Sequence, residues 1–335
     1  MQAPRIETQT LPPPPGIIGS LRSGFDATAT HVTVIFMPLA LDLLLWLGPR
    51  LSVDRMAQPF LKELNTLLAA SGGMKPDDIR NTLDLYGQFF QAFNLLGILR
   101  TFPIGISSLM SGIMPTQTPW GTPKVLEIGS LLQLLGLSLL LTFAGWVFGG
   151  LYFRWVAALA TPGVAEDDHT PTGRAVLQTV LYAVIWSVVS IVVGMPVAVL
   201  LYVLFMINSL LGEGVLLLLG FLSMWLVVPI FFSPHGIFVR KQNALTSILS
   251  GFHLTRFTLP TSSLFVLTIF LLGVGLNVLW SKPANDSWLV LVGIFGHAFI
   301  TTALLASSFV YYHNMSAWLQ VALSRLRAGL PGQQV

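Results

Sequence analysis

The sequence contains no cysteine and few charged residues, and both shortages exclude classes of function. With no cysteine among 335 residues, disulfides, thiolate metal sites, covalent haem attachment and cysteine nucleophiles are excluded. Charged residues make up only 9% of the chain, for a formal net charge of +3. No run of Lys or Arg is dense enough to predict a nucleic-acid partner. The first residues also lack the apolar segment of a secretory signal peptide, so none is predicted.

Long hydrophobic runs, by contrast, are abundant. Hydrophobic residues account for 54% of the sequence, and an α-helix needs about 20 mostly apolar residues to cross a bilayer. Six segments meet this condition, near residues 31–49, 128–153, 177–207, 214–238, 263–281 and 288–312. The pattern therefore predicts an all-α protein, a polytopic transmembrane helical bundle with six spans, whose first partner is the lipid bilayer of a bacterial cytoplasmic membrane.

The predicted organisation is a short arm followed by one membrane domain. Residues 1–15 form a flexible Pro-rich arm, because the four consecutive prolines that end it favour an extended polyproline II conformation. Residues 16–335 form the membrane domain, which includes an extracytoplasmic helical insertion at 51–126. Basic residues concentrate in the short loops after the second, fourth and sixth spans. By the positive-inside rule, both termini are predicted to be cytoplasmic.

Two segments that precede spans resemble each other. Ser20–Thr28 and Ser247–Thr255 share Ser, Ser, Gly, Phe and Thr at a constant offset of 227 residues. Their apolar residues recur at helical spacing, namely Ile18, Leu21 and Phe25 in the first and Leu245, Ile248 and Phe252 in the second. Both segments are therefore predicted to be amphipathic helices at the membrane interface. Internal duplication and the common pattern of any interfacial helix both explain the likeness.

The second of these segments opens a pattern that resembles a known family. An amphipathic helix over Ala244–Arg256, two spans joined by a short turn, and Tyr311-Tyr312-His313 at the exit are similar to six-span bacterial proteins related to the membrane domain of glycerophosphoryl diester phosphodiesterases. The family often has Tyr-Tyr-Asp-x-Arg at this exit, where this chain has His313 and Met315. The resemblance covers roughly residues 170 to 320 and implies a helical membrane bundle without its own hydrolase.

The insertion at 51–126 is expected to form an outer helical cap. Two stripes of apolar residues at helical spacing predict two amphipathic helices, the second beginning near Pro76, with Ser71-Gly72-Gly73 between them. The apolar stretch Thr101–Met114 is too short to span a membrane and contains Pro103, so it is either re-entrant or interfacial. The cap is either a binding lid or a packed cover of the bundle.

Two ionisable residues inside predicted spans form the candidate intramembrane polar site, Asp42 and His297. A lone carboxylate in a bilayer costs about 2.5–3.5 kcal/mol on insertion scales, so Asp42 should find a partner or water. The pair either relays a proton or neutralises a cation, as in a transporter, or makes hydrogen bonds between helices. The second span is rich in glycine, with Gly136, Gly145, Gly149 and Gly150, and this predicts close approach of another segment. A break near Gly194-Met195-Pro196 indicates either a kinked or a discontinuous helix.

No enzyme is predicted. Ser107 with His297 is similar to the Ser–His pair of rhomboid proteases, but the segment that holds Ser107 is not a full span. Glu166-Asp167-Asp168-His169 is interpreted as a solvated turn, because adjacent side chains cannot all bind one metal ion. We therefore expect no catalytic residues, no cofactor and no metal. The predicted role is structural or interaction-based, with other membrane proteins as partners. The alternative is a small transporter or lipid-handling protein that uses Asp42 and His297.

Overall fold

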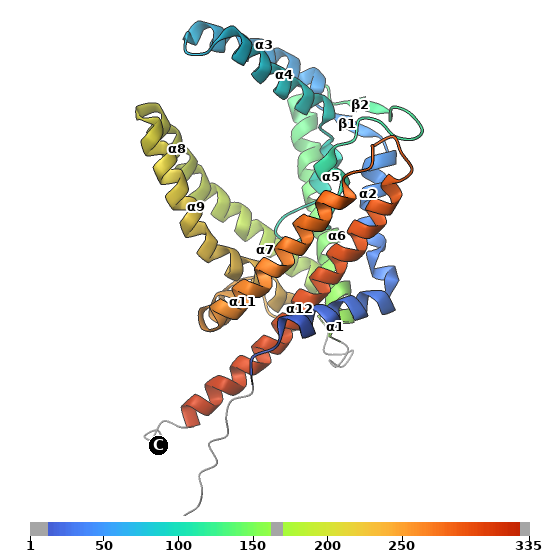
Figure 1. Cartoon of the computed structure of the whole chain (residues 1–335), viewed down its shortest axis with the longest axis vertical. Helices are drawn as coiled ribbons and strands as arrows, with labels where there is room; N and C mark the ends of the chain where they lie inside the picture. The colour runs from blue at the N-terminus through green and yellow to red at the C-terminus, as the bar shows by residue number, and fades with distance from the viewer. Residues whose placement is uncertain (1–12, 162–169, 329–335) are drawn as a thin grey trace, which may run out of the picture.

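The computed structural model describes residues 13–161 and 170–328, with side chains to residue 325. It is a multi-span helical membrane protein, as predicted (Figure 1). Five continuous helical segments are long and apolar enough to cross a bilayer: Leu131–Ala160, Thr172–Ile207, Ser209–Val239, Ala244–Trp280 and Val290–Arg325. A sixth candidate is a pair of helical segments, Ile17–Thr30 and Val32–Leu47, bent by 93°. The predicted first span, 31–49, corresponds to the second member of this pair.

The spans consist of the following elements: α6 (Leu131–Ala160), α7 (Thr172–Val189), η4 (Ser190–Gly194), α8 (Met195–Ile207), α9 (Ser209–Phe232), α10 (His235–Val239), α11 (Ala244–Trp280) and α12 (Val290–Ala328). The predicted break near Gly194 is a π-helical turn, η4, through which α7 continues into α8. Such turns insert an extra residue into a helix without ending it. The third span is therefore one continuous helical segment and not a discontinuous helix.

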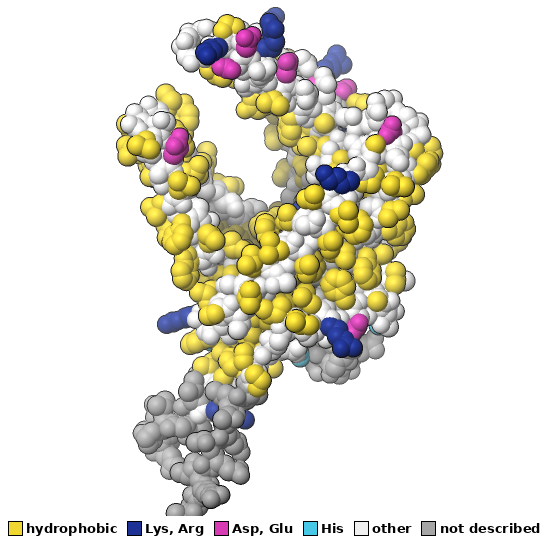
Figure 2. Space-filling model, in the orientation of Figure 1, with side chains coloured by type: hydrophobic (Ala, Val, Ile, Leu, Met, Phe, Trp, Pro, Cys, Tyr) yellow, Lys and Arg dark blue, Asp and Glu magenta, His cyan; other side chains and the backbone are white. Residues whose placement is uncertain are grey.

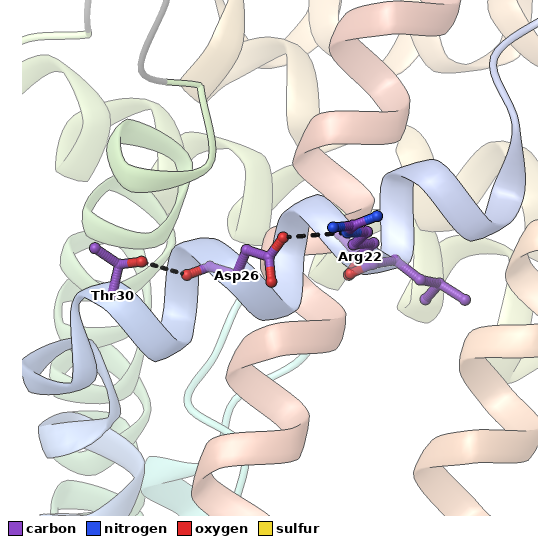
Figure 3. A network of polar contacts seen from close by, with 5 residues as sticks. Arg22, Asp26 and Thr30 are labelled. Atoms are coloured by element: carbon purple, nitrogen blue, oxygen red, sulfur yellow. Dashed lines mark hydrogen bonds and ion pairs between the residues drawn. The ribbon is translucent and has the colours of Figure 1, made fainter.

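Helix α1 (Ile17–Thr30) lies across the middle of α12, where Gly24 meets Ser307, and Figure 3 shows its polar face. On that face Arg22 Nε lies 3.7 Å from Asp26 Oδ2 in an exposed ion pair, and Thr30 donates to the Asp26 carbonyl at 2.8 Å. The face packed against α12 carries Ser20, Gly24 and Thr28, which are buried. A short η1 (Val32–Ile35) then leads into α2 (Phe36–Leu47). The sequence predicted an interfacial helix here, but its packing face is small and polar.

The first part of α11 repeats this arrangement. Ser247, Gly251 and Thr255, the counterparts of the three buried α1 residues, are also buried. Thr255 donates to the Gly251 carbonyl at 3.0 Å, and Thr28 donates to the Gly24 carbonyl at the same distance. Non-helical backbone at Thr258, two residues before Pro260, then turns α11 into its span. The two predicted interfacial segments therefore share a packing face as well as a sequence pattern.

The outer cap contains two amphipathic helices, as predicted, α3 (Asp54–Ser71) and α4 (Pro76–Ala92). Gly72 ends α3 with a φ of 63°, a left-handed conformation that glycine adopts readily. Two elements without a sequence signal are β1 (Arg50–Ser52) and β2 (Val125–Glu127), which pair in parallel and join the ends of the insertion. Arg50 donates to the Gln91 carbonyl, and burial lowers the pKa of its guanidinium while the attraction of Glu127 opposes that shift.

The α8–α9 hairpin extends away from the main core. The largest hydrophobic core lies among α2, α6, α7 and α12 around Trp46, Tyr152 and Phe309. In contrast, no residue of α8 or η4 is buried, although both elements are described in full. Figure 1 shows this hairpin diverging from α6, and Figure 2 shows the hollow between them, with hydrophobic side chains along its walls and the α3–α4 hairpin above it. We call this hollow the outer cleft.

Candidate functional site

Asp42 is buried on α2 and holds a loop in place. Its carboxylate accepts hydrogen bonds from Ser108 Oγ at 2.6 Å, from the Leu109 amide at 3.1 Å and from the Met110 amide at 3.0 Å. The two amides lie at the start of α5 (Met110–Ile113), where backbone N–H groups lack partners within the helix. A carboxylate that accepts several N–H and O–H donors is well stabilised away from water. Asp42 therefore fixes the end of the segment that precedes α5.

That segment, residues 100–109, follows η2 (Leu95–Leu99) and contacts α6 and α12, with its residues 104, 106, 108 and 109 buried and Arg100 and Phe102 exposed. A Cβ on Gly149 of α6 would lie 2.8 Å from Gly105 Cα, so the segment packs on the bare glycine backbone. Ser107 Oγ hydrogen-bonds Thr301 Oγ1 of α12 at 2.7 Å. Irregular backbone is tolerated in a membrane only where protein or water surrounds it. This packing favours the re-entrant alternative, and we call residues 100–109 the re-entrant segment.

His297 lies near the outer end of α12 and is 6% exposed. Its Nε2 atom has no hydrogen-bond partner, and no hydrogen bond joins it to Asp42 within the described chain. Both groups are instead within electrostatic range of Arg100. Ser107 is bonded to Thr301, one turn beyond His297 on α12. The two predicted site residues thus occupy one region without contacting each other directly.

Arg100 is a residue that the sequence reasoning missed. It is exposed, at the start of the re-entrant segment. Its neighbour Thr101 contacts α6 at Gly145, midway along that helix, so Arg100 lies well below the outer end of the bundle. The available signal was its isolation, because Arg100 is the only charged residue between Asp84 and Lys124. Ser108, the partner of Asp42, had no such signal.

A cavity of about 300 Å³ lies where α9 meets α11, α12 and the re-entrant segment. We call it the central cavity. Most of its lining is apolar, including Phe102, Phe231 and Leu304, with Gly273 of α11 also at its wall. Its polar members are Thr301, His235 and Ser308, and His235 Nε2 hydrogen-bonds Ser308 Oγ at 2.8 Å. A pocket with these properties accommodates hydrocarbon and a small number of polar groups.

A second, larger groove of about 680 Å³ lies between α9 and α11. Apart from Ser263, its lining residues are hydrophobic: Phe221, Met224, Trp225, Val227, Val228, Leu259, Pro260, Val266, Leu267 and Phe270. Together with the outer cleft and the central cavity, this groove gives α9 apolar surface on several sides. A helix that is hydrophobic all round is suited to contact with lipid or with other helices.

No candidate metal site occurs in the part of the chain that the structure describes. No group of three or more His, Asp or Glu residues gathers there in a way that could hold a metal ion. The acidic turn at Glu166–His169 lies outside the described residues. Comparison with protein-family models, with curated proteins and with solved structures gives no match for this chain.

Proposed function

We propose that this chain is a lipid-handling membrane protein that receives acyl chains in the outer cleft and the central cavity, without catalysing a reaction. The observation that carries the proposal is the α8–α9 hairpin, which has hydrophobic side chains on the cleft side as well as on the outside. Exposed residues of this hairpin include Val199, Tyr202, Leu217 and Phe221. Such surface is stable only when hydrocarbon or protein covers it.

Acyl chains are the occupant that fits best. Figure 2 shows that the outer cleft opens between the tip of the α8–α9 hairpin and the α3–α4 hairpin. In this proposal the surrounding bilayer supplies lipid to the cleft. The surfaces around the base of α9 are almost free of polar groups, as a hydrocarbon-binding surface requires. Asp42, in this proposal, acts as a structural anchor of the re-entrant segment and not as a proton carrier, because three donors already occupy its oxygens.

A pair of glycines on α11 provides the test. Gly273 lines the central cavity, and a Cβ there would meet only Leu304 Cδ1 at 3.8 Å. Gly273→Phe should therefore fill the cavity without moving the backbone. Gly275 is the matched control, because a Cβ there meets no atom within 4 Å. Native mass spectrometry of the purified protein should show retained phospholipid on the wild type and on Gly275→Phe, and much less on Gly273→Phe.

Two outcomes would contradict the proposal. A wild-type chain that retains no lipid would remove its basis, especially if the protein is then a dimer, because a second copy would cover the apolar surface. Equal lipid retention by the two variants would show that the central cavity is not the binding site.

A scaffold role is the second candidate, and the α3–α4 hairpin favours it. This hairpin exposes large apolar side chains, namely Phe60, Leu67, Leu85, Tyr86 and Phe89. Such a patch suits a membrane surface or another membrane protein. Replacing Leu85 and Phe89 by Ser should release a partner from the protein in native membranes if the scaffold role holds, while lipid retention stays unchanged. The resemblance to the phosphodiesterase membrane domain is compatible with both candidates.

A further inference from the structure

Arg100 is a positive charge without a partner at membrane depth. Its side chain is exposed, and within the described residues it has neither a hydrogen bond nor an ion pair. Thr101 is seated on Gly145 in the middle of α6, so Arg100 lies about half-way along that span. An unpaired guanidinium inside a membrane is costly, and such residues mark functional sites. Arg100 is therefore a candidate binding site for an anion that the described residues do not supply.

The carboxylate of Asp42 does not meet this need. Asp42 lies within electrostatic range of Arg100, but its two oxygens accept Ser108 Oγ and the amides of Leu109 and Met110. Those bonds hold the carboxylate on the side of α2 that faces α5. The N–H donors of the Arg100 guanidinium therefore stay free for another ligand. They lie in one plane, and their geometry matches the oxygens of a phosphate or a carboxylate.

Further unpaired polar atoms lie on the two helices that flank this region. Among the described residues, His297 Nε2 and Trp280 Nε1 are buried and have no hydrogen-bond partner. The Trp280 ring packs against the backbone of α12 at Gly296, the residue before His297. His297, in turn, is within electrostatic range of Arg100. Trp280 Nε1 can only donate a hydrogen bond, and His297 Nε2 donates in one tautomer. Buried donors of this kind normally have partners.

The surface next to Arg100 is hydrocarbon-like. Phe102, two residues further along the re-entrant segment, is 77% exposed and lines the central cavity. Thr101, between them, is turned toward α6. A ligand for this region therefore has an oxyanion and apolar chains in the same molecule, which is the chemistry of a phospholipid.

We propose that Arg100 binds the phosphate of a phospholipid whose acyl chains occupy the outer cleft and the central cavity. This proposal rests on the proposed lipid-handling function and names its ligand class. The phosphate would lie deeper than the headgroups of the surrounding bilayer. The protein would then hold a lipid that is partly withdrawn from the membrane.

The test separates headgroup recognition from binding of acyl chains. The purified, delipidated protein is titrated in detergent with dioleoyl phosphatidylglycerol or with dioleoylglycerol, which has the same chains and no phosphate, and bound lipid is measured by native mass spectrometry. Wild-type protein should prefer the phospholipid, and Arg100→Gln should lower that preference about tenfold, as loss of a charge-assisted contact predicts. Arg100→Lys should retain part of it. Arg80→Gln, a matched change at an exposed arginine of α4, should leave it unchanged.

Each result has one meaning. If Arg100→Gln keeps the wild-type preference while Gly273→Phe loses both lipids, headgroup binding at Arg100 is refuted and lipid handling stands. If the wild type binds neither lipid, the proposed function fails. If glycerol 3-phosphate alone displaces the phospholipid at Arg100, the ligand is a soluble phosphate compound, and the lipid proposal is overturned. Gel filtration of each variant confirms that the fold is intact.

Discussion

Replacing Asp42 by Asn tests whether this carboxylate is an anchor or a carrier of protons. The substitution keeps the shape of the side chain and replaces one carboxylate oxygen, an acceptor, by an NH₂ group, which can only donate. If the remaining oxygen serves Ser108 Oγ and the Met110 amide, the new NH₂ group faces the Leu109 amide, 3.1 Å from the present oxygen. One buried N–H then lacks a partner, which costs about 1–3 kcal/mol.

Asp42→Ala removes both oxygens and provides an upper limit. The Leu109 and Met110 amides then both lack partners, so the expected loss is about 2–6 kcal/mol, at about 1–3 kcal/mol for each group. Ser108 can rotate to another acceptor, so it adds little. The matched control is Asp26→Asn on α1, which breaks an exposed ion pair of 3.7 Å and should cost at most about 1 kcal/mol.

The assay is thermal unfolding of the purified variants in one detergent, combined with lipid retention by native mass spectrometry. We expect Asp26→Asn to have the highest unfolding temperature, Asp42→Asn a lower one and Asp42→Ala the lowest. All three variants should still bind lipid at temperatures below their unfolding transition. An Asp42→Asn protein as stable as the Asp26→Asn control would refute the anchoring role. Proton-coupled uptake in vesicles that Asp42→Asn abolishes without loss of stability would support the transporter alternative.

Three further predictions follow from the packing of glycines and from the absence of cysteine. Gly149→Ala should destabilise the protein by about 1–3 kcal/mol, because its methyl group would push the re-entrant segment off α6. Gly136→Ala is the control and should leave stability unchanged, because no atom lies within 4 Å of the new carbon. Gly24→Ala should loosen α1 from α12, since the added carbon meets the backbone of that helix, while Gly19→Ala should be neutral; protease sensitivity of α1 distinguishes the two. In this cysteine-free chain, Gly73→Cys should react with a membrane-impermeant maleimide added outside intact cells, and labelling only after lysis would reverse the predicted orientation.

Much of the fold was predictable because hydropathy is a local property. The five continuous spans need only long apolar runs, and α3 and α4 need only helical periodicity with a glycine break. The strands β1 and β2 were missed because three-residue pairs 75 residues apart have no local pattern. In α1, Ile18, Leu21 and Phe25 were predicted to form one apolar face, but Ile18 is 82% exposed while the Phe25 ring packs on Phe299 of α12. Helical spacing alone does not show which members of an apolar face meet the protein.

The candidate site was less predictable, because its contacts are tertiary. Asp42 was singled out from the cost of a charge in a membrane, which is a property of one residue. Its partner Ser108 lies 66 residues away in a segment whose folding depends on the glycine face of α6. His297 was identified by the same reasoning, and its position near Arg100 depends on how the re-entrant segment enters the bundle. Sequence reasoning finds such residues and does not show how they are arranged.

The α8–α9 hairpin has a mechanical consequence. No residue of α8 is buried in protein. If the hairpin moves, α8 exchanges contacts with lipid for contacts with other apolar groups. Contacts with lipid and contacts with apolar side chains have nearly equal free energy in hydrocarbon. The base of α9 is different, because Val228, Pro229 and Phe232 are buried there. The contacts of the described residues therefore fix the base of the hairpin and leave the position of its free end to the apolar groups that surround it.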